Sequence, residues 1–350
     1  MTFTAANCGS TAPRPAASFD PDTGPLVPDA KKISPDTIVH KVGYNGRPGA
    51  FADVACRMAF PSADRIAMPS LETAIASTVR GDVDRILLPC ENSLVGRVPD
   101  VHKIVPDSGL HIVGEHFQRV EHCLMAPAGT TLASIRRVRS HPVALGQVSR
   151  LIAALDLEAI AAPTTSHAAE LVASRADPSE AAIASDLAAN LYGLNILKRN
   201  VEDDPHNTTR FYVLSAEPQA IEHKTQLLTT IVFRTQNRPG CLYHAIAGFA
   251  DNGINMTKIE SYLVGGQFVP SRFLCEFEGD PAVPEVADAL DILVMRARSL
   301  FSAHFQWLAA IYAIAARKIS ILGEPSLRPP FDGLIVNRKA KAHDDSHDQP

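Results

Sequence analysis

Cysteine is scarce in this chain, and its spacing argues against two kinds of site. The six cysteines are far apart in the 350 residues, and no two of them form a Cys-x-x-Cys pair. Structural zinc sites and dithiol redox sites commonly use such pairs, so we expect neither. Several cysteines lie in apolar runs, as Cys90 does after residues 86–88. We interpret them as small buried thiols in a reducing compartment.

Clusters of positive charge and long apolar runs are also lacking. The formal net charge is -5 and the basic residues are scattered, which argues against a nucleic-acid-binding surface. The most apolar stretch, 300–316, contains His304 and Gln306 and is too short to span a bilayer comfortably. Residues 1–18 lack the apolar core of a signal peptide. We therefore expect a cytoplasmic protein without a nucleic-acid or membrane partner.

The composition divides the chain into segments. Residues 1–37 are rich in proline, and the tail at 327–350 is polar from about Asn337 onward. Both segments are predicted to be disordered. Between them, 38–216 alternates short apolar runs with segments of helical spacing, such as the helix that Ser70 is suited to cap. This alternation predicts an α/β domain with mainly parallel strands. The predicted strands are 38–42, 65–68, 84–89, 109–114, 121–126, 137–139, 157–161, 181–184 and 210–214.

A second unit follows a polar segment, 217–226, which we interpret as a linker. The order strand, helix, strand, strand, helix, strand over 227–326 predicts a ferredoxin-like βαββαβ sandwich. Its two middle strands are joined by Gly265-Gly266, a hairpin signal. The predicted elements are 228–234, 240–251, 255–264, 269–277, 285–297 and 319–322.

Three polar clusters, at 43–51, 91–93 and 140–142, directly follow predicted strands. In open α/β sheets, ligands bind beyond the carboxyl ends of the strands. Loops that open into helices there also offer free backbone N–H groups to anions. These clusters therefore predict a cleft for a small anionic ligand. A fourth cluster, 207–211, enters a strand instead, which suggests that the chain returns there to the first half of the domain.

Taken together, these clusters resemble the ordered motifs of prephenate dehydratases. The unit at 227–326 resembles the ACT domain of that family, with 238–242 and 259–262 similar to its two ligand loops. The resemblance covers roughly residues 38–280. The segments that carry it in the first domain are Gly46 to Phe51, Glu91-Asn92-Ser93, Glu121-His122-Cys123, Ser140-His141-Pro142, Leu191-Tyr192-Gly193-Leu194, Asn200-Val201-Glu202-Asp203 and Thr209-Arg210-Phe211.

The resemblance implies a fold and an activity. The catalytic domain would have two subdomains with a hinge-like crossing, similar to periplasmic binding proteins, and would be followed by the ACT domain. Its cleft would hold prephenate, which loses carbon dioxide and water to give phenylpyruvate. No metal or organic cofactor is needed. Family members bind L-phenylalanine between two ACT domains, which implies feedback inhibition and a homodimer or homotetramer.

The Thr-Arg-Phe motif supplies the candidate catalytic residue, Thr209. A threonine hydroxyl is too weak an acid to store a proton at neutral pH, so we expect it to donate a hydrogen bond to the leaving hydroxyl. The alternative is a threonine that caps a turn. Arg210 could bind a substrate carboxylate through two nitrogens, or form an internal salt bridge beneath the cleft. Phe211 is expected among the substrate-binding residues.

The clusters at 91–93 and 140–142 supply further substrate-binding candidates. Asn92 and Ser93 could bind a carboxylate or the hydroxyl, although Asn92 could instead stabilise its own loop. Glu91 would be protonated beside a dianion, or would point away and pair with a cation. Ser140 is expected to cap the helix at 142–155 and also to bind ligand. Gln147, two turns further on, matches a binding glutamine of the family.

The histidines His122 and His141 are interpreted as structural rather than as general bases. In the ACT-like unit, Gly240 suggests a close approach of ligand or partner backbone, or a purely structural turn. The segment 298–318 is longer than the family pattern and apolar nearly all round, so it should be buried or bind a partner. The residues expected to bind phenylalanine are Pro239, Gly240, Cys241, Leu242, Glu260 and Ser261.

Two alternatives remain open at this stage. The substrate could be arogenate, which would give phenylalanine directly. The chain could also be a non-catalytic amino-acid sensor with a similar cleft. The Thr-Arg-Phe motif favours the enzyme, because a sensor does not need the threonine donor.

Overall fold

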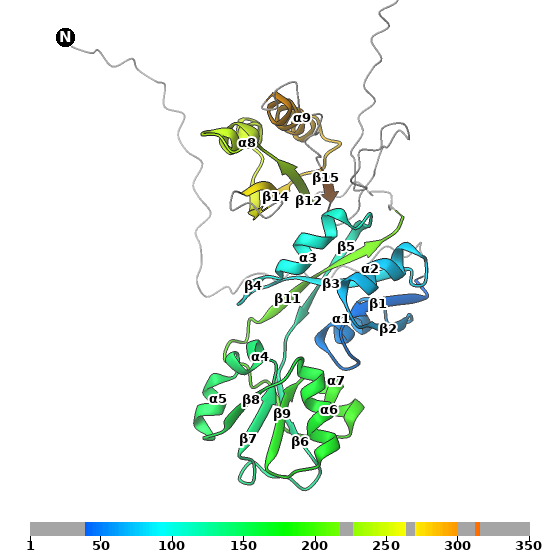
Figure 1. The fold of residues 1–350 in the computed structure, drawn as a ribbon, viewed down its shortest axis with the longest axis vertical. Helices are drawn as coiled ribbons and strands as arrows, with labels where there is room; N and C mark the ends of the chain where they lie inside the picture. Colours follow the sequence, from blue (N-terminus) through cyan, green and yellow to red (C-terminus); the bar gives the residue numbers. More distant parts are fainter. Residues whose placement is uncertain (1–38, 218–226, 264–269, 300–311, 316–350) are drawn as a thin grey trace, which may run out of the picture. The chain divides into compact units, whose positions relative to one another are not determined.

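The computed structural model describes residues 39–217, 227–263, 270–299 and 312–315, which form three sheets with their helices (Figure 1). The predicted leader, most of the predicted linker, the Gly265-Gly266 turn and the tail at 327–350 lie outside these residues. So do 300–311 and 316–318 of the apolar segment. The α/β class and the βαββαβ order predicted for 227–326 are both confirmed. The prediction of mainly parallel strands in 38–216 is wrong, because the strands at 208–215 and 123–126 run antiparallel to both of their neighbours.

The first sheet has the strand order β2-β1-β3-β11-β5, with the short β4 paired to β3. Strands β1, β2 and β3 are parallel, whereas β11 runs antiparallel to both β3 and β5. The chain thus returns to this sheet through β11, as the sequence suggested. The strands are β1 Lys41–Asn45, β2 Asp64–Met68, β3 Arg85–Asn92, β4 Gly96–Arg97, β5 His111–Arg119 and β11 Thr208–Ser215. The helices are α1 Phe51–Ala59, α2 Leu71–Val79, α3 Pro99–Ile104 and the 3-10 helix η1 Val105–Asp107.

The second sheet has the order β10-β6-β9-β7-β8 and lies between two pairs of helices (Figure 1). Its helices α6 and α7 begin at Thr164 and Ser185, whose hydroxyls accept hydrogen bonds from the backbone N–H three residues on. The strands are β6 Cys123–Ala126, β7 Arg137–Ser140, β8 Glu158–Ala161, β9 Glu180–Ala184 and β10 Asn195–Lys198. The helices are α4 Pro142–Gly146, α5 Ser149–Ala154, α6 Thr165–Arg175 and α7 Asp186–Tyr192.

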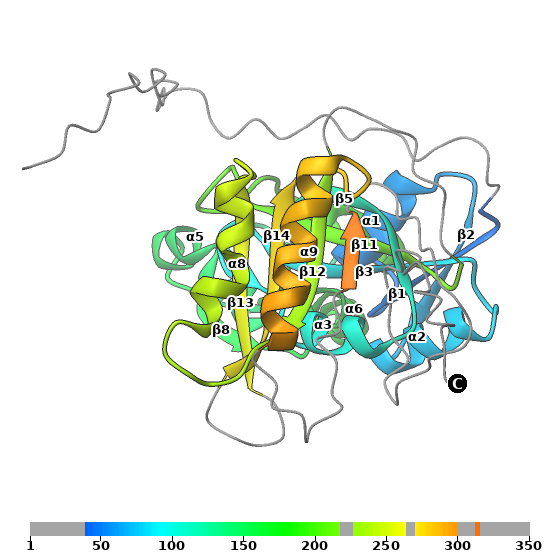
Figure 2. The ribbon, with the colours of Figure 1, turned by 90° about the horizontal axis from the view of Figure 1, so that it is seen from above.

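The third sheet is antiparallel, in the order β13-β14-β12-β15, and its helices α8 and α9 lie on one face (Figure 2). The edge strand that pairs with β12 on the side away from β14 is β15, which lies within the segment interpreted as an insertion. The expected last strand, 319–322, lies outside the described residues. The elements are β12 Leu228–Arg234, α8 Cys241–Asp251, β13 Met256–Leu263, β14 Pro270–Glu278, α9 Pro284–Ser299 and β15 Tyr312–Ala315.

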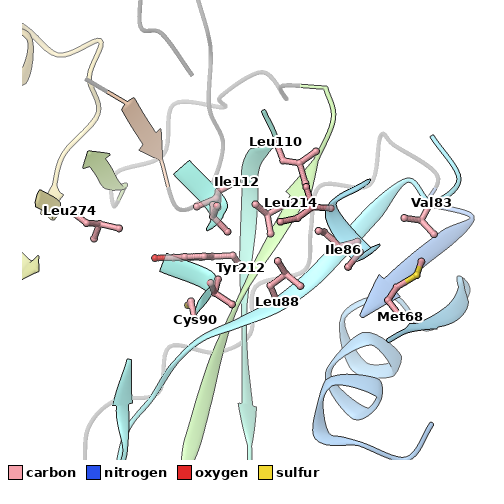
Figure 3. Packing of buried hydrophobic residues seen from close by; sticks show 14 of the residues in the cluster. Met68, Val83, Ile86, Leu88, Cys90, Leu110, Ile112, Tyr212, Leu214 and Leu274 are labelled. Carbon is pink, nitrogen blue, oxygen red and sulfur yellow. The ribbon is translucent and has the colours of Figure 1, made fainter. Parts of the chain in front are cut away.

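One buried cluster joins the first and third sheets. Leu88, Ile112 and Tyr212 of the first sheet belong to the same core as Val232 and Leu274 of the third (Figure 3). The opposite face of the third sheet, with Phe273 and Phe277, packs under α8 and α9 instead. Both faces of the third sheet are therefore covered. The face without helices rests on the first sheet, whose strands β3 and β11 contain the motifs Glu91-Asn92 and Thr209-Arg210-Phe211.

No helix within the described part of the chain is both long and apolar enough to cross a membrane.

Candidate active site

Thr209 lies directly opposite Asn92 in the pairing of β11 with β3. Asn92 Nδ2 donates a 3.1 Å hydrogen bond to Thr209 Oγ1. The orientation of the amide is fixed because Asn92 Oδ1 accepts from the backbone N–H groups of Leu94 and Val95, at 3.0 and 3.1 Å. Thr209 Oγ1 is consequently the acceptor in this pair. Its own hydrogen remains available for an acceptor beyond the strand.

The segment before Thr209 is attached to the end of β3 by side chains. Asn92 Nδ2 also donates to Asn207 Oδ1 at 2.8 Å, and Asn207 is buried. Ser93 Oγ donates to the carbonyl of His206 at 2.9 Å and accepts from Thr208 N at 3.0 Å. Asn92 therefore stabilises its own loop, which the sequence left open as an alternative, and it also contacts Thr209. The Ser93 hydroxyl is engaged by the protein.

Arg210 and Glu91 face away from the Thr209 site and form an internal ion-pair cluster. Arg210 Nε donates to Glu115 Oε2 at 2.8 Å, and its NH1 donates to Glu276 Oε2 at 2.9 Å. Lys258 Nζ lies 3.1 Å from Glu91 Oε2. The substrate-binding role expected for Arg210 and Glu91 is thus corrected. Successive side chains of a strand point to opposite faces, so Arg210 and Glu91 face away from their neighbours Thr209 and Asn92. Arg210 forms the internal salt bridge, and Glu91 pairs with a cation, which were the alternatives to substrate binding.

Electrostatics keep this cluster ionised despite its burial. Burial by itself would lower the pKa of Arg210, but the nearby carboxylates of Glu276 and Glu115 raise it. Burial would raise the pKa of Glu276, but Arg210 and Lys258 hold it below its usual value. The guanidinium of Arg210 is therefore committed to protein carboxylates.

The substrate-binding roles expected for Phe211 and Ser140 are also corrected. Phe211 is 2% exposed and belongs to the core under α1, where it cannot touch a ligand in the cleft. Ser140 is fully buried, and its Oγ donates a 2.7 Å hydrogen bond to the carbonyl of Ile183 on β9. The cap of α4 is His141 instead, whose Nδ1 accepts from Val143 N at 3.3 Å. Ser140 is the last residue of β7, so its side chain reaches across the sheet rather than along the helix.

Gln147 lies at the end of the short α4, beside His122. Its Oε1 is 3.0 Å from His122 Nε2. Burial lowers the pKa of His122, so the imidazole is neutral at neutral pH. The ring of Phe51, from α1, meets His122 edge-on with centroids 5.3 Å apart. The predicted helix 142–155 is broken after Gly146, where Gln147 O accepts from Asp203 N at 2.7 Å.

The loop after β1 contacts the second sheet's helices through its backbone, which the sequence did not indicate. Ser185 Oγ donates to Gly49 O at 2.6 Å, and Ser166 Oγ donates to Pro48 O. Gly49 has φ +80°, and a Cβ placed on it would lie 2.9 Å from the Cα of Ala188. The available signal was the Gly-Arg-Pro-Gly sequence. It was interpreted as a ligand loop, whereas these contacts join the first and second sheets.

The residues expected to bind phenylalanine do not all face one way. Gly240 has φ +79° and begins α8, and Cys241 is buried, while Pro239 is exposed and Leu242 is half-buried. On β13, Ser261 is exposed, whereas Glu260 Oε2 accepts from Arg97 NH1 at 2.9 Å. Because neighbours on a strand face opposite sides, Glu260 cannot share a ligand with Ser261 in one protomer. The Glu260 carboxylate is thus engaged by Arg97, and phenylalanine binding by these residues stays a prediction.

Comparisons with known proteins agree with this arrangement. Residues 42–219 match the family described as Prephenate dehydratase. A protein of Komagataeibacter europaeus, named as a bifunctional N-acyl-homoserine lactone acylase/prephenate dehydratase, is 47% identical over 253 residues, which are 72% of this chain and 90% of that protein. An Arabidopsis thaliana arogenate dehydratase/prephenate dehydratase is 39% identical over 63% of this chain and 58% of its own length.

Two solved structures superpose on most of the chain. The prephenate dehydratase of Arthrobacter aurescens, solved in complex with L-Phe, superposes with a TM-score of 0.70 at 26% identity, covering 81% of this chain and 93% of that one. GqqA, described as a novel type of quorum quenching acylase, gives 0.69 at 43% identity, covering 79% and 98%. The chain belongs to the prephenate dehydratase family and is, as such, a lyase.

Proposed function

We propose that the protein converts prephenate to phenylpyruvate, carbon dioxide and water, and that Thr209 is its catalytic residue. The observation that carries the proposal is the pair of Asn92 and Thr209, in which the amide occupies the threonine oxygen and leaves the hydroxyl hydrogen to donate. As the bond to the ring carboxylate breaks, its electron pair enters the ring and the ring hydroxyl departs. A hydrogen-bond donor at that oxygen stabilises the developing negative charge. It also relays a proton from solvent, so that the hydroxide leaves as water and the threonine hydroxyl is restored.

Substrate binding is proposed for the groups around this donor. Gln147 and the neutral His122 lie at the second sheet. Asn92 and Ser93, at the end of β3, are proposed to act by holding Thr209 and the segment before it in place. Arg210 is left out of substrate binding because its guanidinium is bound by protein carboxylates.

Regulation by L-phenylalanine and assembly into dimers or tetramers are part of the same proposal. Support comes from the βαββαβ unit and from the left-handed Gly240 at the start of α8, beside the exposed Pro239. A ligand that binds one arrangement of two such units more tightly would increase the population of that arrangement, and with it of the cleft conformation that accompanies it. Addition of phenylalanine should then lower the rate, and sedimentation should show no monomer; an unaffected rate or a monomer argues against this part.

The test of the activity is direct. Purified protein is incubated with prephenate or with arogenate, and phenylpyruvate is followed by its absorbance in alkali and phenylalanine by chromatography. The proposal expects phenylpyruvate from prephenate, at a higher kcat/KM than the conversion of arogenate. Preference for arogenate would correct the substrate. No product from either compound at high protein concentration would favour the amino-acid sensor.

A further inference from the structure

Two successive residue pairs lie side by side where β3 meets β11. Asn92 is opposite Thr209, and Glu91 is opposite Arg210. The first pair forms the proposed catalytic site. The second pair points to the other face of the sheet, toward the third sheet, because side chains alternate along a strand. A contact that fixes Glu91 and Arg210 therefore also fixes the backbone that carries Asn92 and Thr209.

The third sheet presents a complementary pair. Lys258 of β13 is opposite Glu276 of β14. Lys258 lies 3.1 Å from Glu91, and Glu276 lies 2.9 Å from Arg210, so each cation of one pair meets the anion of the other. The side chains of Arg210 and Glu276 are only 10% and 2% exposed. Solvent screening at this contact is therefore weak.

Glu276 holds β11 at two positions. Its Oε2 accepts from Arg210, and its Oε1 accepts from Tyr212 Oη at 2.9 Å and from Thr230 Oγ1 at 3.2 Å. Arg210 and Tyr212 are two residues apart on the strand and face the same way. One carboxylate of the third sheet thus fixes the stretch of β11 that begins immediately after Thr209.

The strand ladder alone is irregular at this point. Arg210 pairs with Glu91, but Phe211 pairs with Pro89, so Cys90 is an extra residue in β3. Cys90 Sγ lies 3.3 Å from the carbonyl of Arg210. Such a bulge bends a strand and redirects its side chains. The bulge lies in β3, while the pairing of β11 with β5 is regular from Thr208 to Val213. The contacts of Glu276 therefore add to the ladder where the pairing of β11 with β3 is interrupted.

We propose that Glu276 is a positioning residue for catalysis: by holding Arg210 and Tyr212 it keeps Thr209 Oγ1 against Asn92. This inference rests on the proposed function. It gives the third sheet a part in turnover itself, in the absence of any effector.

The test compares Glu276→Gln with the wild-type chain on prephenate. The variant keeps the shape of the side chain but removes the charge that binds Arg210. Because Glu276 touches no substrate, we expect kcat to fall at least tenfold while KM changes less than threefold. The matched control is Arg272→Gln, which breaks a paired contact with Asp107 at 2.8 and 2.9 Å, also between the third sheet and the first, without touching β11. Its kcat should equal that of the wild type.

Two further variants show whether the effect passes through Arg210. Arg210→Gln and the double variant with Glu276→Gln should have the same kcat. The glutamine at 276 can still accept from Tyr212, so the second change removes only a charge that no longer meets Arg210. Multiplied losses would mean that the two residues act separately and would overturn the proposal. Tyr212→Phe, which removes one hydroxyl, should lower kcat two- to fivefold.

The failures can be told apart. If circular dichroism shows that Glu276→Gln does not fold, the proposal is tested on Tyr212→Phe instead. A wild-type kcat in that variant overturns the proposal. Wild-type kcat in a folded Glu276→Gln variant overturns it as well, while the proposed function stands. A wild-type chain that does not convert prephenate removes both.

Discussion

Ser185 Oγ donates a 2.6 Å hydrogen bond to the carbonyl oxygen of Gly49, which ties the loop after β1 to the first turn of α7. The same hydroxyl accepts from Ala188 N and so caps the helix. Gly49 can approach this closely only because it has no side chain. The sequence predicts a ligand-binding loop here, and the structure shows that the loop also joins two sheets.

The first prediction concerns this joint. Gly49→Ala should lower the free energy of unfolding by about 2–5 kcal/mol, because it combines a left-handed alanine with a clash against the α7 backbone. The matched control is Gly81→Ala, at φ +79° with nothing within 4 Å of the added Cβ. It should cost about 1–2 kcal/mol. Urea unfolding of the two variants checks this, and equal losses would show that the approach to Ala188 does not matter.

The second prediction concerns the catalytic hydroxyl. Thr209→Val should lower kcat by roughly 100-fold or more, since loss of a positioned proton donor usually costs that much. Thr209→Ser, which keeps the hydroxyl, should retain most of the activity. Thermal unfolding should show that both fold like the wild type. Wild-type turnover in the valine variant would mean that the donor has been placed on the wrong residue.

The third prediction separates stability from binding at Ser140. Ser140→Ala leaves the buried carbonyl of Ile183 without its donor, so it should cost about 1–3 kcal/mol of stability. Its KM for prephenate should stay within twofold of the wild type. Ser174→Ala removes an exposed hydroxyl that donates to Leu171 O and should cost at most about 0.5 kcal/mol. A large rise in KM for Ser140→Ala would restore Ser140 as a ligand residue.

The fourth prediction concerns pH. Burial lowers the pKa of His122 below its ordinary value of 6.5, as it also does for His102 and His116. The unfolded chain therefore binds protons that the folded chain does not, and the free energy of unfolding falls as the pH drops below about 6.5. Urea titrations between pH 7.5 and 5 should show this loss. His122→Gln should reduce its slope, and an unchanged slope would mean that His122 is charged in the fold.

The sequence predicts elements well because their signals are local. Apolar periodicity located the strands, and Ser70 marks the start of α2, where its Oγ accepts from Thr73 N at 3.1 Å. The alternation along β11 even implies that Thr209 and Arg210 face opposite sides. The motifs of the resemblance placed Asn92 and Thr209 in one site, and the structure brings them into contact.

Partners distant in sequence are not predictable in the same way. Nothing near Arg210 indicates that its carboxylate partner is Glu276, 66 positions away on another sheet. The Ser140 side chain looked like a helix cap because a helix follows it, but the neighbouring strand β9 offered a closer acceptor. The pairing of β15 with β12 depends on the geometry of the sheet edge, which apolar composition does not define.

The register of β5 with β11 has one more consequence. Arg119 and Thr208 are cross-strand neighbours, and Val120 N donates to Asn207 O at 2.8 Å. The whole second sheet with its helices is thus an insert whose two ends meet. Replacing residues 120–207 by a short turn would close a continuous hairpin between β5 and β11. The excised piece could be produced as a separate polypeptide, and mixing the two would measure how strongly the halves associate.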